Sequence, residues 1–215
     1  MARRILVTGA TGTVGGATMR LLKADPFRTM WDAIRAHVTD PHLLATFARF
    51  ATYNGKVLRL NADATTPDDQ PESTPIYSLD HPQPTALDWQ PVSGALWVVD
   101  GVERSGGRLS AVAAHDLQQR RAAFRTAYTL PQGTGASSAR FYRGHLMSMF
   151  SGNLFIAAAT GRQLIRLQFD PDNPARITSV DRMLTDEIGT VRVVAEGPDG
   201  ALYLASDTAL YRLRP

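Results

Sequence analysis

Three glycines near the N-terminus have the spacing found in loops that bind phosphate groups. Gly9, Gly12 and Gly15 follow the short apolar segment 5–7, and a segment with helical character follows at 17–23. Glycines at this spacing let the backbone approach a pyrophosphate closely, and the positive end of the following helix stabilises its charge. The motif taken alone predicts dinucleotide binding, with NAD(P) as the cofactor.

The residues after this motif do not build the domain that such a cofactor needs. Residues 1–54 offer at most one strand–helix–strand unit, and such a unit cannot bury both faces of a parallel sheet. The chain also has no Tyr-x-x-x-Lys catalytic pair. The sequence therefore favours a short βα fragment, followed by a helical linker, over a working NAD(P) domain.

Composition narrows the classes of protein further. The 215 residues include 23 Lys and Arg against 20 Asp and Glu, and they contain no cysteine. Disulfides, thiolate metal sites and cysteine nucleophiles are thus excluded. The arginines are scattered, so the sequence does not predict nucleic-acid binding. We also expect neither a membrane span, because no apolar run reaches about 20 residues, nor a signal peptide.

From residue 55 onward the chain is built of short β-rich segments, and three of them resemble one another. They read SGALWVVD at 93–100, SGNLFIAA at 151–158 and DGALYLAS at 199–206. Each has a turn glycine, then Leu, an aromatic residue and an apolar strand, and two are soon followed by a second strand, at 163–170 and 209–215. Repeated antiparallel hairpins of this kind are typical of propeller blades.

We therefore predict a mainly β fold, a partial β-propeller of about three blades from a six-bladed type, preceded by a short N-terminal βα segment. The predicted domains are residues 1–54 and 55–215. Trp89, Trp97, Phe155 and Tyr203 are expected to pack between blades. A β-sandwich with similar hairpins is the alternative fold.

Residues 55–215 resemble the glucose/sorbosone dehydrogenase family. The matching stretches include HPQPTALDWQPVSGALWVVD, ARFYRG, GNLFIAAATGRQLIRLQFD and VRVVAEGPDGALYLASD, in the family's order and spacing. The resemblance implies a propeller that binds pyrroloquinoline quinone (PQQ), often with calcium, and oxidises sugars to lactones. It also implies a periplasmic or secreted protein. The first 24 residues resemble instead the opening of NmrA-like and extended short-chain reductases.

The resemblance also suggests which residues would hold the PQQ carboxylates. Arg192 matches one of two family arginines, and Thr190 replaces the other. In the family an Arg-Asn pair follows a blade's first His, whereas here Pro82 and Gln83 follow His81. Thr160 takes the place of a family Lys, so Arg162 is the nearest substitute. The predicted PQQ contacts are accordingly Arg192, Gln83, Arg162 and His81.

Calcium and the catalytic base are less well matched. Asp100 and Glu103 are the predicted calcium ligands, but Arg108 stands where an acidic residue would be expected. The family's catalytic His would precede residue 55, where only His37 and His42 occur, in sequence that does not match. The catalytic residue is therefore left unassigned.

The sequence thus favours a PQQ-dependent sugar dehydrogenase-like protein with an incomplete site, which would transfer hydride from a sugar C1 to PQQ weakly or not at all. Two alternatives stay open. One is a non-catalytic propeller module that binds a partner or carbohydrate, and the other is an NAD(P)-binding reductase fragment. An open half-ring also exposes strand edges and a blade face, which favours association. Two explanations stay open: a truncated or fused gene product, or a chain that closes its ring by pairing with another copy.

Overall fold

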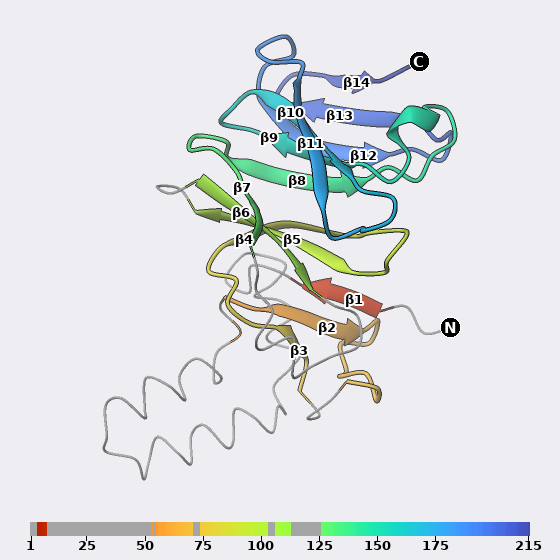
Figure 1. Ribbon diagram of the computed structural model, residues 1–215. Coiled ribbons are helices and arrows are strands. Elements are labelled where there is room, and N and C mark those ends of the chain that lie inside the picture. The colour runs from red at the N-terminus through yellow and green to blue at the C-terminus, as the bar shows by residue number, and fades with distance from the viewer. Residues whose placement is uncertain (1–3, 8–52, 54, 71–73, 103–105, 113–125) are drawn as a thin grey trace. The chain divides into compact units, whose positions relative to one another are not determined.

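The computed structural model describes residues 4–7, 53, 55–70, 74–102, 106–112 and 126–215 (Figure 1). The chain divides into two compact units, Met1–Pro82 and Gln83–Pro215. The described secondary structure consists of antiparallel strands and one short 3-10 helix, Ser148–Phe150. Within these residues, no helix has the length and apolar character needed to cross a membrane.

The first unit contains a three-stranded sheet with the order β1 (Arg4–Val7), β2 (Val57–Asn61) and β3 (Ile76–Ser78). Buried Leu58 and Leu60 of β2 pack with Tyr53 and Ile76 in its core. The strand predicted at 5–7 is present, but it pairs antiparallel with β2. A dinucleotide-binding unit requires parallel strands, so the predicted Rossmann-like start is not supported. Gly9, Gly12 and Gly15 lie outside the described residues.

The second unit contains three antiparallel sheets, which we call blades 1 to 3. Blade 1 comprises β4 (Pro84–Trp89), β5 (Leu96–Val102), β6 (Gly106–Val112) and β7 (Thr126–Thr129). Blade 2 comprises β8 (Ala136–Phe141), β9 (Leu154–Ala158), β10 (Gln163–Phe169) and β11 (Ile177–Met183). Blade 3 has β12 (Val191–Glu196), β13 (Leu202–Ser206) and β14 (Leu210–Arg212).

The three repeated segments are equivalent in the structure, because each includes all or most of the second strand of its blade, β5, β9 or β13. Their glycines, Gly94, Gly152 and Gly200, have φ angles of 67°, 73° and 73°. This left-handed region is readily accessible to glycine and strained for most other residues. Each glycine therefore allows the tight turn by which the chain enters the second strand of its blade. This turn follows either the first strand directly or the loop after that strand.

The blades stack face to face in chain order (Figure 1). Between blades 1 and 2, Trp97 lies edge-on to Phe169 at 4.9 Å and to Phe141 at 6.4 Å between ring centroids. Between blades 2 and 3, Phe155 packs in a second core with Leu202 and other aliphatic side chains. Four-stranded or smaller antiparallel sheets that share buried faces in this way are the packing expected of propeller blades.

The mainly β, partial propeller fold predicted from the sequence is confirmed. Of the four aromatic residues expected between blades, Trp97 and Phe155 are fully buried, whereas Trp89 is 39% exposed. The domain boundary placed at 54/55 stays a prediction. The sheet of the first unit spans this boundary, because β1 precedes residue 54 and pairs with β2, which follows it.

Candidate functional site

The first strand of each blade forms an inner row, in which β8 lies between β4 and β12. Ser137 of β8 donates its hydroxyl to the carbonyl oxygens of Val191, at 3.2 Å, and Arg192, at 2.8 Å. One residue further along, the Ser138 hydroxyl donates to the carbonyl of Val194 at 3.3 Å. The step from Ser137 to Ser138 along β8 moves the hydrogen-bond partner from Arg192 to Val194 along β12. The two strands therefore run in the same direction.

Each inner strand carries a β-bulge at its second residue. The register with the neighbouring strand skips Thr85 in β4, Ser137 in β8 and Arg192 in β12. A bulge adds one unpaired residue and redirects its side chain, and bulges are over-represented beside active sites. We call Thr85, Ser137 and Arg192 the bulge row, and we call the end of the blades where they lie the strand-start end.

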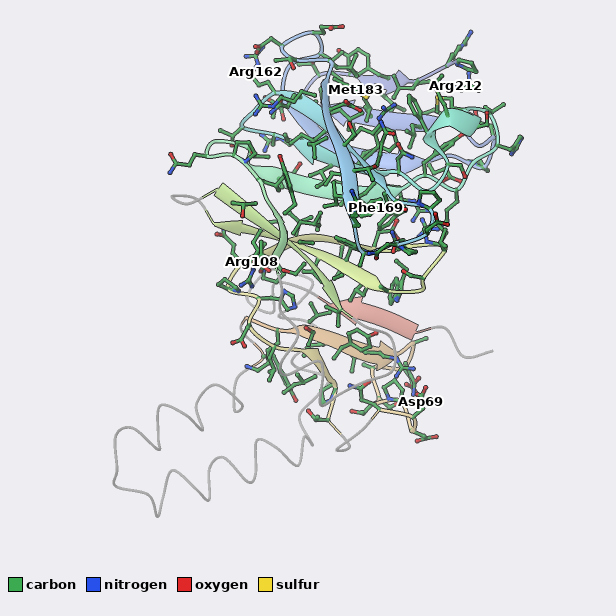
Figure 2. The ribbon with its side chains drawn as sticks, in the orientation of Figure 1. Asp69, Arg108, Arg162, Phe169, Met183 and Arg212 are labelled. Atoms are coloured by element: carbon green, nitrogen blue, oxygen red, sulfur yellow. The ribbon has the colours of Figure 1, made fainter. Side chains whose placement is uncertain are left out.

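Strand register brings other predicted site residues to this same end. Asp100 pairs with Pro84, the first residue of β4, and Arg108 pairs in turn with Asp100. The turn containing Thr160 and Arg162 follows Ala158, which pairs with Ala136 at the start of β8. Figure 2 shows Arg108 and Arg162 on this side of the blades and Arg212 on the other.

Arg192 projects from the bulge in β12 as an exposed side chain. Its Nε donates to Oδ1 of Asp207 at 2.8 Å, and both side chains are about half exposed. The hydrogen bond and charge of Asp207 raise the pKa of Arg192, and the hydrogen bond from Arg192 lowers the pKa of Asp207. Both groups are therefore charged at neutral pH, and Arg192 carries an acidic neighbour.

Arg162 occupies the turn between β9 and β10 with a φ of 49°, in the left-handed region. Its Nε lies 2.8 Å from Oδ1 of Asp186, and both side chains are largely exposed. The backbone N–H of Asp186 also donates to the carbonyl of Arg162 at 2.9 Å. Like Arg192, this predicted cationic contact is accessible but balanced by a nearby aspartate.

Asp100 and Gln83 meet at the start of blade 1. The Asp100 carboxylate is fully buried, accepts the backbone N–H of Gln83 at 3.3 Å, and lies 3.3 Å from the Arg108 guanidinium. The Gln83 residue itself is exposed. A calcium ion at Asp100 would therefore have to replace Arg108. No group of three or more His, Asp or Glu residues with metal-binding geometry occurs in the described residues, which do not include Glu103.

His81 belongs to the first unit and is fully buried there. Its Nε2 lies 2.8 Å from the Ser78 hydroxyl, and its backbone N–H donates to the carbonyl of Gly55 at 2.9 Å. These contacts close the loop that joins β3 to the end of the unit. They indicate a structural use of the imidazole, while its predicted contact with PQQ stays a prediction.

The opposite end of blades 1 and 2 holds a charged cluster to which the sequence reasoning assigned no role. Arg143 donates to both oxygens of the buried Asp88 carboxylate, at 2.9 and 3.0 Å. Asp88 also accepts the backbone N–H of Phe141 at 2.7 Å, and Arg140 lies 3.7 Å away. Asp88 and Arg143 both fall inside stretches in which the sequence resembles the family. That resemblance was the signal by which the sequence could have revealed them. The cluster joins the strand ends of β4 and β8.

Comparison with known proteins finds similarity to sugar dehydrogenases. The glucose/sorbosone dehydrogenase family model matches residues 108–213. The aldose sugar dehydrogenase YliI of Escherichia coli K12 is 26% identical over 187 residues, which are 71% of this chain and 48% of that protein. An uncharacterised Synechocystis protein is 23% identical over 73% of this chain and 44% of its own length.

Solved structures agree in fold. A glucose dehydrogenase superposes with a TM-score of 0.64 at 28% identity, over 75% of this chain and 51% of that one. The PQQ-bound aldose sugar dehydrogenase of Streptomyces coelicolor gives 0.55 at 19% identity, over 70% and 45%. The chain thus spans about half the length of the relatives it matches. It is glucose/aldose sugar dehydrogenase-like, and the resemblance predicted from its sequence is confirmed.

Proposed function

We propose that this chain is a PQQ-binding, aldose sugar dehydrogenase-like propeller module whose site is incomplete. The observation that carries the proposal is the bulge row, in which the same irregularity recurs at the start of all three inner strands. In blade 3 it presents Arg192, the residue that matches a PQQ contact of the family, as an exposed side chain.

The donors at the strand-start end fit the carboxylates of PQQ in part. Guanidinium groups bind carboxylates through short, charge-assisted hydrogen bonds. Arg192 and Arg162 could each hold one carboxylate, and the Gln83 amide could donate to another. Thr160 and Thr190 stand where the resemblance implies cations, and neither supplies a charge. PQQ, when bound, would accept the hydride from the sugar C1, and an incomplete donor set predicts slow turnover.

Two aspartates modulate this proposed contact. Asp207 and Asp186 each place a carboxylate oxygen 2.8 Å from the Nε of Arg192 and of Arg162, respectively. Exposed ion pairs of this kind are weakly held, because water screens the charges and two flexible side chains must be ordered. A carboxylate of the ligand can therefore replace each aspartate, at some loss of affinity.

The proposal predicts how PQQ affinity responds to substitution at this end. Arg192→Ala should weaken binding about tenfold, because one charge-assisted contact is lost. Asp207→Asn should tighten binding, since the competing carboxylate is removed and the guanidinium stays. Isothermal titration calorimetry of the full chain with PQQ measures both changes.

Arg212→Ala is the matched control, because Arg212 also pairs with an exposed aspartate, Asp199, but lies at the other end of blade 3. Its PQQ affinity should equal that of the unsubstituted chain. Equal affinities for all variants, or no PQQ binding by the unsubstituted chain, would exclude the proposed site.

A further inference from the structure

The bulge in β12 that presents Arg192 differs from the two other bulges in how it is held. In β4 the bulged residue is Thr85, whose hydroxyl donates to the carbonyl of Val99 in the next strand at 3.3 Å. In β8 it is Ser137, whose hydroxyl lies 3.3 Å from the equivalent carbonyl, that of Ala157. Each hydroxyl can thus fix its own bulge inside its blade. Arg192 has no hydroxyl, so this means of fixing the bulge is absent in β12.

Ser137 supports the β12 bulge from the neighbouring blade. Its Oγ lies 2.8 Å from the carbonyl oxygen of Arg192 and 3.2 Å from that of Val191. The contact with Arg192 is also shorter than the contact with Ala157 inside blade 2. The β12–β13 register skips Arg192, so the bulge takes the backbone of this residue out of the regular ladder. A donor from β8 compensates for this irregularity and favours the bulged register over the regular one.

The register of β12 decides where the Arg192 side chain lies. Side chains alternate between the two faces of a sheet, so a shift of register by one residue moves a side chain to the other face. If the bulge were lost, Arg192 would enter the ladder. Its guanidinium would no longer be fixed where Nε donates to Asp207 at 2.8 Å. Whatever holds the bulge therefore also holds the exposed guanidinium.

We propose that Ser137 is a positioning residue for Arg192, because its hydroxyl holds the β12 bulge in the register that presents the guanidinium at the strand-start end. The consequence for ligand binding rests on the function proposed above, in which Arg192 holds a PQQ carboxylate. Ser137 acts through the backbone of blade 3 rather than through a ligand contact. Thr85 shows that the equivalent bulge in blade 1 accommodates threonine, so Ser137→Thr should preserve the hydroxyl bond.

NMR spectroscopy tests the positioning without any ligand. The side-chain Nε–H of Arg192 is hydrogen-bonded to Asp207, and its ¹H–¹⁵N signal is identified as the one that Arg192→Ala removes. Ser137→Ala should shift or broaden this signal, whereas Ser137→Thr should preserve it. The Nε–H of Arg212, which donates to Asp199 at 2.9 Å, is the internal reference and should not change. An unchanged Arg192 signal in Ser137→Ala would overturn the proposal.

Ser138→Ala is the matched control. This neighbouring hydroxyl also joins β8 to β12, but it bonds the N–H and the carbonyl of Val194, both at 3.3 Å and outside the bulge. Its removal should cost about as much stability as Ser137→Ala, yet leave the Arg192 signal and the PQQ affinity unchanged. Equal effects of the two substitutions on the Arg192 signal would point to general loosening between the blades, and so contradict a specific role for Ser137.

Calorimetric titration with PQQ tests the consequence for binding. Ser137→Ala should weaken the affinity about fivefold, as expected for one hydrogen bond and less than for Arg192→Ala. In the Arg192→Ala background it should have no further effect, because a positioning residue acts only through the group that it positions. A persisting effect would refute the inference. If the unsubstituted chain does not bind PQQ, the proposed function fails, and the NMR result still decides whether Ser137 positions Arg192.

Discussion

Replacement of Trp97 by alanine is expected to lower the free energy of unfolding by about 4 kcal/mol, the range for a large buried aromatic residue. The indole is 1% exposed and fills the core between blades 1 and 2, against Phe141 and Phe169. Its removal leaves a cavity bordered by both sheets, and strand backbones cannot easily collapse to fill it. Urea denaturation followed by circular dichroism measures the loss.

Trp89 provides a control of the same residue type. It ends β4 with 39% of its surface exposed, so Trp89→Ala should cost much less than Trp97→Ala. Phe155→Ala, in the equivalent repeat position, should resemble Trp97→Ala. Equal losses for Trp97→Ala and Trp89→Ala would contradict the assignment of the inter-blade core.

Replacement of Asp88 by alanine is expected to cost about 3 kcal/mol, because it leaves the buried backbone N–H of Phe141 without its acceptor and removes the charge-assisted hydrogen bonds from Arg143, whose side chain is 31% exposed. Asp88 accepts two hydrogen bonds from Arg143 and one from the backbone of Phe141. All three bonds join β4 to β8 or to the loop after it, so their loss should separate the strand ends of two blades.

Asp186→Ala is the matched control for this second substitution. Asp186 also pairs with an arginine, Arg162, but the aspartate is 69% exposed, so its removal should have little effect on stability. Asp88→Asn should fall between the two, since an amide oxygen can still accept the Phe141 N–H. A double-mutant cycle with Arg143→Ala should give a large coupling energy. No coupling would show that the pair does not hold the blades together.

Local signals in the sequence predicted the blades correctly. The glycine at the start of each repeat marks a turn with positive φ, and the short apolar run that follows forms the second strand. The second strand predicted at 163–170 agrees with β10 to within one residue. These elements depend on neighbours close in the chain, which is why sequence alone is sufficient to find them.

The site depended on contacts between distant residues, and the sequence did not reveal these. Asp207 lies 15 residues after Arg192, with which it pairs, and Asp186 lies 24 residues after Arg162 by their numbering. The bulges at Thr85, Ser137 and Arg192 are equally hidden, because each is a property of the register between two strands. For the same reason, the apolar segment 5–7 was recognised as a strand while its antiparallel partner was not.

The central claim is that PQQ binds at the strand-start end, and hydrogen–deuterium exchange of the full chain with and without PQQ tests it most directly. A bound ligand slows exchange in the backbone that it orders. The account predicts slower exchange in peptides covering residues 159–163 and 189–193, with residues 142–150 and 197–201 at the opposite end unchanged. Protection confined to that opposite end, or to the glycine-rich N-terminal segment, would contradict it.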